Sequence, residues 1–212
     1  MGKFKAIIFD LDGTLVDSYE AILQSLNFTL ESLGFPLVNL ETVKKRVGRG
    51  LDNLIWESVG QDYLQKGIDL FRQSYNETHL TGTHLLPGVQ ETLSNLNRRH
   101  VRMGVASNKP SDYSKNILRH LRVERYFIDC YGPDIVGAPK PDPSMLFALM
   151  KEMQSEPEET LYVGDMILDV ESSRNARLRV ALVPTGSSTL EELEKGNPDY
   201  LLKSFSELLS IF

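Results

Sequence analysis

The stretch Ala6-Ile7-Ile8-Phe9-Asp10-Leu11-Asp12-Gly13-Thr14 decides the fold of this 212-residue chain. The run from Phe4 to Phe9 is apolar and rich in β-forming residues, which is typical of a buried parallel strand. It ends abruptly at two aspartates and a glycine, a composition that favours a turn. We therefore predict a strand that delivers Asp10 and Asp12 to one edge of a parallel sheet.

Residues 17–82 follow a different pattern. Apolar residues recur there at helical spacing, and no strand pattern is convincing. The block is too long for a simple crossover between neighbouring strands. We predict two units: an α/β core made of residues 1–16 and 83–212, and an inserted all-helical cap made of residues 17–82. Its hinges are expected near residues 15–18 and 81–87.

Beyond Pro87-Gly88, strands alternate with helices. The predicted strands are 101–106, 126–131, 160–163, 180–183 and 199–202. The predicted helices are 89–96, 113–121, 143–153, 170–176, 190–194 and 205–212. Such alternation is typical of a doubly wound parallel sheet with helices on both faces.

Composition and charge exclude several classes of protein. The net charge of −6 gives no broad basic surface for nucleic acid. The apolar runs are too short to cross a membrane, and the N-terminus has no apolar signal region. A single cysteine, Cys130, excludes a disulfide framework, and we expect it to be a small buried residue. We expect a cytoplasmic protein with no nucleic-acid or membrane partner.

Polar residues follow three of the predicted strands. They are Asp10 and Asp12 after the first, Ser107-Asn108-Lys109 after the second, and Asp165 after a later one, with Asp169 four residues on and Lys140 in a separate loop. Each alone is typical of a turn residue or a helix cap. In a parallel sheet, however, ligands bind outside the carboxyl ends of the strands. Two carboxylates about 4 Å apart repel by about 4 kcal/mol at an effective dielectric constant near 20. Their convergence therefore predicts a hard cation such as Mg²⁺.

Carboxylates, a metal ion, a lysine and a hydroxyl suit phosphoryl transfer. Asp10 is placed to attack phosphorus and form an aspartyl phosphate. Asp12, two residues later, is placed to protonate the leaving oxygen and then to activate water. Gly13 and Thr14 offer backbone N–H groups to the phosphate.

These residues resemble the motifs of the haloacid dehalogenase superfamily of phosphatases. The motifs are Asp10–Ser18, Ser107-Asn108-Lys109, Lys140-Pro141-Asp142-Pro143, and Gly164-Asp165 with Asp169, and they cover nearly the whole chain. The pattern is most similar to the phosphoglycolate phosphatase branch. The resemblance implies a Rossmann-like core and a helical cap.

The resemblance also implies roles for individual residues. Mg²⁺ would be held by the Asp10 side chain, the Asp12 carbonyl and Asp165, with Asp169 binding it directly or through water. The phosphoryl group would be held by Ser107, Asn108 and Lys140, and Lys140 would also pair with Asp10. A departure follows the fourth motif, where relatives usually carry glycine or a small residue and this chain has Ala176-Arg177. This departure predicts that the helix before Ala176-Arg177 ends in a different shape from that of its relatives.

The expected activity is Mg²⁺-dependent hydrolysis of a small phosphorylated metabolite, 2-phosphoglycolate first among them, by a monomer or homodimer. In the cap, Gly48-Arg49-Gly50 opens a helix, and a helix N-terminus beside an arginine suits an anion. We expect Arg49, with Lys45, to meet a second anionic group of the substrate. The alternative is that Arg49 is a solvated loop residue.

Other functions fit the same sequence features to different degrees. An inorganic pyrophosphatase would use the same residues and stays open. A β-phosphoglucomutase-like phosphotransferase is disfavoured, because no histidine lies near Ser18. A receiver-like phosphoaspartate signalling module lacks both the large insertion and an acid like Asp12. A nucleotide-cofactor enzyme would need a Gly-x-Gly-x-x-Gly turn after the first strand.

Overall fold

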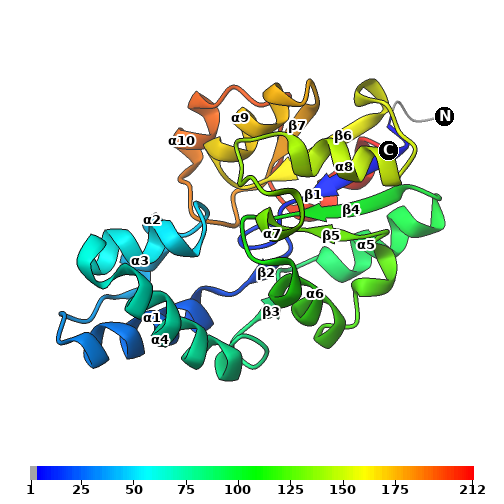
Figure 1. The fold of residues 1–212 in the computed structure, drawn as a ribbon. Coiled ribbons are helices and arrows are strands. Elements are labelled where there is room, and N and C mark those ends of the chain that lie inside the picture. The colour runs from blue at the N-terminus through cyan, green and yellow to red at the C-terminus, as the bar shows by residue number, and fades with distance from the viewer. Residues whose placement is uncertain (1–3) are drawn as a thin grey trace.

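A six-stranded parallel sheet forms the centre of the computed structural model, which describes residues 4–212 (Figure 1). Its order is β5-β4-β1-β6-β7-β8. The strands are β1 (Ala6–Phe9), β4 (Arg102–Ala106), β5 (Cys130–Tyr131), β6 (Thr160–Gly164), β7 (Arg179–Leu182) and β8 (Tyr200–Leu201). The chain builds β4 and β5 on one side of β1 and then returns to build β6 on the other. This reversal places a ligand-binding crevice at the carboxyl ends of β1 and β6.

Side chains of the central strand alternate between two apolar layers, as the geometry of a strand requires. Ile7 and Phe9 pack in one cluster, and Ala6 and Ile8 pack in the other. The first layer is covered by α5 (Val89–Arg98), α6 (Ser111–His120) and the 3₁₀ segment η4 (Phe205–Ser210). The second is covered by α8 (Ser144–Glu152), α9 (Ile167–Asn175) and α10 (Leu190–Lys195). The predicted doubly wound α/β fold is confirmed, and Cys130 is buried as expected.

Four helices between β2 and β3 form a lobe beside the sheet (Figure 1). They are α1 (Tyr19–Leu33), α2 (Leu40–Arg46), α3 (Leu51–Val59) and α4 (Leu64–Thr78), with a 3₁₀ turn η1 (Gln61–Tyr63) before the last. We call them the helical unit. It has its own apolar cluster, in which Leu26, Ile55 and Phe71 are buried. No helix among the described residues is long and apolar enough to cross a bilayer.

Both connections to the helical unit run through a two-stranded antiparallel ribbon. Strand β2 (Val16–Asp17) leads into α1, and β3 (His84–Leu85) leads back to the core. Val16 pairs with Leu85, and Asp17 pairs with His84. The sequence did not predict this ribbon, because two-residue strands have no readable period. It lies within the segments expected to act as hinges.

Other departures from the predicted elements lie in short segments. The strand predicted over 126–131 is limited to β5, and a 3₁₀ turn, η2 (Glu124–Tyr126), precedes it. The closing helix is the 3₁₀ segment η4 rather than an α-helix. Three further short elements were not predicted: η1, α7 (Pro133–Val136) and η3 (Pro157–Glu159). Arg177 has a φ of 60°, in the left-handed region that favours glycine, which explains why a glycine suits this position.

Candidate active site

Asp10 and Asp165 lie side by side because they follow adjacent strands. Asp10 comes directly after β1, and its backbone N–H donates to the carbonyl of Val163 in β6 over 2.8 Å. Asp165 follows the last residue of β6, and both carboxyl groups are buried. Together with Asp169 they bring carboxylate oxygens within 4.8 Å of one another. The structure therefore gathers the acidic cluster that the strand ends predict.

Asp169, in the first turn of α9, already has a full set of hydrogen-bond donors. Its Oδ2 accepts from the backbone N–H groups of Asp165 and Met166, each over 3.0 Å. Its Oδ1 accepts from the Tyr162 hydroxyl over 3.0 Å and from Lys140 Nζ over 2.8 Å. Gly164 permits this close approach, since a Cβ there would lie 2.2 Å from Asp169 Cγ. Asp169 thus acts first as an anchor for its neighbours.

Lys140 connects two members of the cluster. It lies in the loop between α7 and α8, and its Nζ is 2.9 Å from Asp10 Oδ1 and 2.8 Å from Asp169 Oδ1. Burial alone would lower the pKa of Lys140, but Asp10 and Asp169 raise it well above its usual value. The ammonium therefore stays charged and holds Asp10 in a fixed orientation.

The cluster fits a divalent cation. Among the described residues it buries three carboxylates (Asp10, Asp165 and Asp169) against one ammonium (Lys140), an excess of two negative charges. Burial raises the pKa of Asp10 to about 6, although Lys140 opposes the shift. Burial, followed by the charges of Asp169 and Asp10, raises the pKa of Asp165 well above its usual value. Ionised carboxylates are thus unfavourable here without a cation, and hard oxygen donors suit Mg²⁺.

The pKa of Asp10 predicts how magnesium stabilisation depends on pH. This pKa is about 6 in the folded protein without metal, above the ordinary 3.8, so the folded chain holds an extra proton between those values. Its free energy of unfolding therefore falls as pH rises from about 4 to about 6. Because metal binding needs ionised carboxylates, we expect Mg²⁺ to raise the thermal unfolding midpoint more at pH 7 than at pH 5. Scanning fluorimetry with MgCl₂ or EDTA measures this, and equal shifts would contradict it.

Asp12 lies beside a lysine that the sequence gave no role. Lys109 Nζ is 3.0 Å from Asp12 Oδ1, and the Ser18 hydroxyl donates to the same oxygen. Lys109 also donates to the hydroxyl of Tyr75, in α4, over 2.6 Å. Both Lys109 and Tyr75 are buried or nearly so. One oxygen of Asp12 is therefore held firmly, and the helical unit takes part in holding it.

The loop after β1 already uses the two N–H groups that were expected to bind phosphate. The N–H of Gly13 donates to the Val16 carbonyl and that of Thr14 to the Leu11 carbonyl, so both are used within the loop. The Thr14 hydroxyl donates to Asp165 Oδ1 over 2.9 Å. Within the part of the chain that the structure describes, the N–H groups of Leu11 and Asp12 have no hydrogen-bond acceptor. These two groups, which the sequence reasoning missed, are the ones available to an anion.

The two polar residues after β4 have different roles. Ser107 is buried, lines the cavity above Asp10, and keeps its hydroxyl proton available. The Asn108 amide instead accepts from the Lys140 N–H over 2.7 Å and donates to the Gly48 carbonyl over 2.9 Å. Asn108 therefore positions Lys140 and connects the helical unit to the core.

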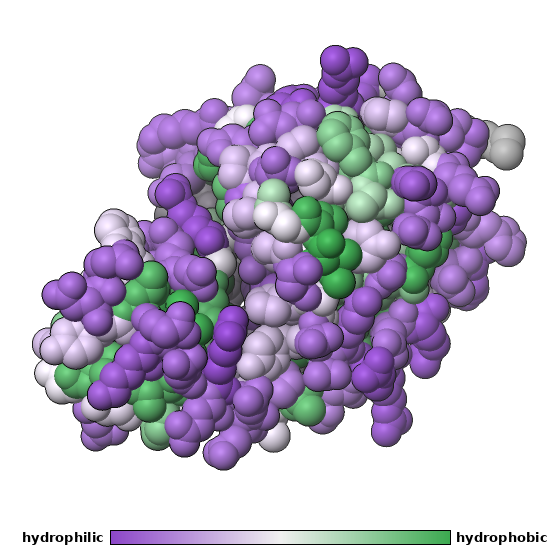
Figure 2. Space-filling model, viewed as in Figure 1, coloured by the Kyte–Doolittle hydropathy of each residue, from purple (hydrophilic) through white to green (hydrophobic). Residues whose placement is uncertain are grey.

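A cavity lies between the core and the helical unit, where the space-filling view shows a hollow between two lobes (Figure 2). Its volume is about 70 Å³, which is room for a small molecule. The core contributes Asp10, Asp12, Ser107 and Lys109. The helical unit contributes mainly apolar side chains, namely Ile22, Val47, Leu51, Leu54 and Phe71.

The structure does not bring Arg49 or Lys45 to this cavity. Neither lines it, and both are exposed. Lys45 instead pairs with Glu41, one turn earlier on α2, over 2.7 Å. The Gly48–Gly50 loop does reach the site, but through the Gly48 carbonyl and the backbone of its glycines. In this structure the short loop presents its backbone to the cavity and the Arg49 side chain lies outside, so a contact of these two cations with the substrate stays a prediction.

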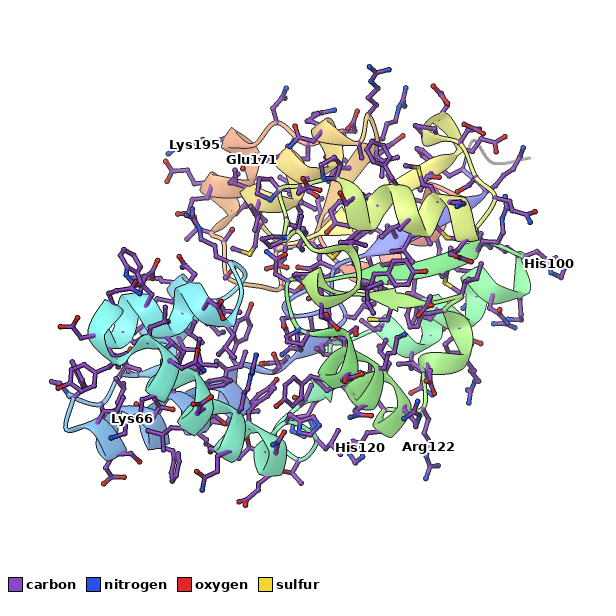
Figure 3. The ribbon with its side chains drawn as sticks, viewed as in Figure 1. Lys66, His100, His120, Arg122, Glu171 and Lys195 are labelled. Carbon is purple, nitrogen blue, oxygen red and sulfur yellow. The ribbon has the colours of Figure 1, made fainter. Side chains whose placement is uncertain are left out.

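None of the described residues that line the cavity is a histidine. His100 and His120 lie at the periphery of the core and point away from the hollow, as do Arg122, Glu171 and Lys195 (Figure 3). Lys66, also at the periphery, lies on the helical unit. The only acidic or histidine cluster suited to a metal within residues 4–212 is the one around Asp10.

Comparison with known proteins agrees with this geometry. A sequence profile of the haloacid dehalogenase-like hydrolases matches residues 7–183. The chain belongs to this family, and within it to the phosphatases. It is similar to the phosphoglycolate phosphatase of Vibrio parahaemolyticus, with 35% identity over 98% of this chain and 95% of that one. It is also similar to phosphoglycolate phosphatase 1 of Pseudomonas aeruginosa, with 31% identity over 97% of this chain and 78% of that one.

Solved structures agree with these sequence comparisons. A predicted phosphoglycolate phosphatase from Haemophilus somnus superposes with a TM-score of 0.94 at 27% identity, covering 100% of this chain and 99% of that one. A predicted phosphatase from Clostridium acetobutylicum gives a TM-score of 0.89 at 26% identity, covering 98% and 97%. The Rossmann-like fold with an inserted helical block is thus shared with these proteins.

Proposed function

We propose that this protein is a Mg²⁺-dependent phosphatase that hydrolyses 2-phosphoglycolate to glycolate and phosphate. The observation that carries the proposal is the position of Asp10, at the end of the central strand. Its carboxylate lies within a buried acidic cluster and is held by Lys140 over 2.9 Å. A fixed carboxylate beside a cation site is the arrangement that nucleophilic attack on a phosphate ester needs.

Asp10 and Asp12 divide the chemistry between them. An oxygen of Asp10 attacks phosphorus, the bond from phosphorus to the ester oxygen breaks, and Asp12 gives that oxygen a proton. Asp12 then takes a proton from water, whose oxygen attacks phosphorus and breaks the bond to Asp10, so that phosphate leaves. Because Lys109 and Ser18 hold Asp12 Oδ1, its second oxygen is the one that carries the proton.

The remaining residues hold the phosphoryl group and the metal. Ser107 and the N–H groups of Leu11 and Asp12 would bind phosphoryl oxygens. Mg²⁺ would be held by the side chains of Asp10 and Asp165 and by the Asp12 carbonyl, and it would neutralise charge on the phosphoryl group. Asp169 would act through water, because its oxygens already accept four hydrogen bonds.

We propose that residues 17–82 act as a cap over residues 1–16 and 83–212. The cavity between the two units and the contact of Gly48 with Asn108 support this role. A closed cap excludes bulk water during formation of the aspartyl phosphate and reopens to release product. The β2–β3 ribbon, which carries both connections, is the place where it would bend.

The proposed substrate rests on the names of the similar phosphoglycolate phosphatases and on the small cavity. Among the residues that line the cavity, Lys109 is the one that carries a positive charge, so we propose that it faces the substrate carboxylate. The enzyme would act in the cytoplasm, as a monomer or homodimer.

The proposal is tested by phosphate release from a panel of substrates. The panel contains 2-phosphoglycolate, pyrophosphate, β-glucose 1-phosphate and p-nitrophenyl phosphate, and each substrate is assayed with MgCl₂ or with EDTA. We expect the highest kcat/KM with 2-phosphoglycolate and no turnover in EDTA. Preference for pyrophosphate would transfer the assignment to an inorganic pyrophosphatase. Undiminished turnover in EDTA would refute the metal site.

A further inference from the structure

Tyr19 carries a buried hydroxyl group with no partner. It is the first residue of α1, only 2% of its surface is exposed, and its Oη makes no hydrogen bond with any described residue. Buried polar atoms in folded proteins are nearly always paired, so each exception calls for an explanation such as an ion or a water molecule. Phenylalanine would fill the same space with its ring, so the hydroxyl group is the feature that needs an explanation.

The Tyr19 hydroxyl points into the acidic cluster. Tyr19 lines the cavity together with Asp10 and Asp12. A Cβ placed on Gly13, where φ is +81°, would lie 2.6 Å from both Tyr19 Oη and Asp165 Oδ2. Tyr19 Oη, from the helical unit, and Asp165 Oδ2, from the core, therefore both lie next to Gly13.

A second orphaned hydroxyl lies at the same place. Ser187 also lines the cavity, its Oγ is buried without a partner, and it neighbours the Tyr19 hydroxyl. Its backbone N–H donates to Asp165 Oδ2 over 3.1 Å. The two hydroxyls are close enough to interact with each other, and neither has another partner among the described residues, so a polar ligand beside Asp165 would be shared by both.

We propose that Tyr19 Oη and Ser187 Oγ bind a water molecule coordinated to the divalent cation. This inference rests on the proposed function, because it needs the metal. A metal-bound water directs a lone pair at the cation and donates both hydrogens, so it needs acceptors around it. A neutral hydroxyl accepts one of these hydrogens and donates its own to a nearby carboxylate, which phenylalanine cannot do.

The environment keeps the Tyr19 hydroxyl neutral. Burial, followed by the charges of Asp165, Asp12 and Asp10, raises the pKa of Tyr19. Since Tyr19 begins α1, the affinity for metal then depends on how the helical unit sits on the core. Tyr19 and Ser187 are positioning residues, because they act on the cation through its water.

The test measures magnesium binding without turnover. The thermal unfolding midpoint is followed against MgCl₂ concentration for the wild type, Tyr19→Phe and Ser187→Ala, with no substrate present. We expect each variant to need roughly tenfold more Mg²⁺ for half of the maximal shift, the lower end of the range for residues that orient metal ligands. Tyr63→Phe, which removes an exposed hydroxyl from the helical unit, is the matched control and should follow the wild type.

Each outcome is decisive. Asp165→Asn should lose the Mg²⁺ response, which confirms that the shift reports this site. If both hydroxyl variants bind Mg²⁺ like the wild type, the inference is wrong while the proposed function stands. An unchanged Mg²⁺ response with a raised KM for 2-phosphoglycolate also overturns it, because the hydroxyls would then contact substrate. A wild type that shows no Mg²⁺ response would overturn both proposals. If Tyr19→Phe does not fold in EDTA, Ser187→Ala alone decides.

Discussion

Asp10→Asn reduces phosphate release by about 10⁴-fold or more, which is the scale of loss when a covalent nucleophile is removed. The amide is nearly isosteric with the carboxylate but is a poor nucleophile towards phosphorus. The measurement is kcat for 2-phosphoglycolate in saturating MgCl₂. Asp112→Asn, which changes an exposed aspartate on α6, is the control and should keep wild-type activity.

A second readout separates loss of the nucleophile from loss of structure. Wild-type enzyme quenched in acid during turnover should carry one phosphate on Asp10, detectable by mass spectrometry of its peptides. Asp10→Asn should carry none while unfolding at a temperature close to that of the wild type. Near wild-type turnover in this variant would show that water attacks the ester directly.

Lys140→Met should destabilise the protein by about 3–5 kcal/mol, the scale for removing one partner of a buried ion pair. The Lys140 ammonium is the partner of both Asp10 and Asp169, and all three groups are buried. Methionine fills the space but leaves two buried carboxylates without their cation. Urea unfolding at pH 7 in EDTA measures the change in the free energy of unfolding.

The control for this variant is Lys151→Met, because Lys151 is exposed on α8. It should change the free energy of unfolding by less than about 0.5 kcal/mol. Adding Asp10→Asn to Lys140→Met should recover part of the lost stability, because one unpaired buried charge is then removed. A loss below about 1 kcal/mol in Lys140→Met would contradict the view that Lys140 neutralises the cluster.

The sequence could predict the sheet and the acidic cluster because both depend on strong local patterns. The apolar run before Asp10 defines a buried strand, and parallel strands bring their carboxyl ends to one edge. The gathering of Asp10 and Asp165 follows from that topology alone, whereas the pairing of Lys140 with Asp10 was expected from the family resemblance, because Lys140 lies in a loop. Short elements such as β2, β5 and η4 have too few residues for a period, so their type and bounds were predicted poorly or not at all.

The contacts of the helical unit could not be predicted, because they depend on how two units dock. Arg49 looked like an anion ligand in the sequence, yet the Gly48 carbonyl makes the contact with the core and Arg49 is exposed. The sequence analysis gave no role to Tyr75 or Tyr19. Their hydroxyls reach Lys109 and the acidic cluster only once the unit lies on the sheet. No spacing in the sequence encodes that orientation.

The β2–β3 ribbon has a consequence for how such enzymes can diversify. Because its two strands are paired, the inserted segment leaves and rejoins the core at neighbouring points. An insertion with adjacent ends can be exchanged or lengthened without altering the distance that the core must span. We expect a chimaera that carries a relative's helices between Asp17 and His84 to fold and to keep its nucleophile. The chimaera would then prefer the same leaving group as the relative that supplied the helices.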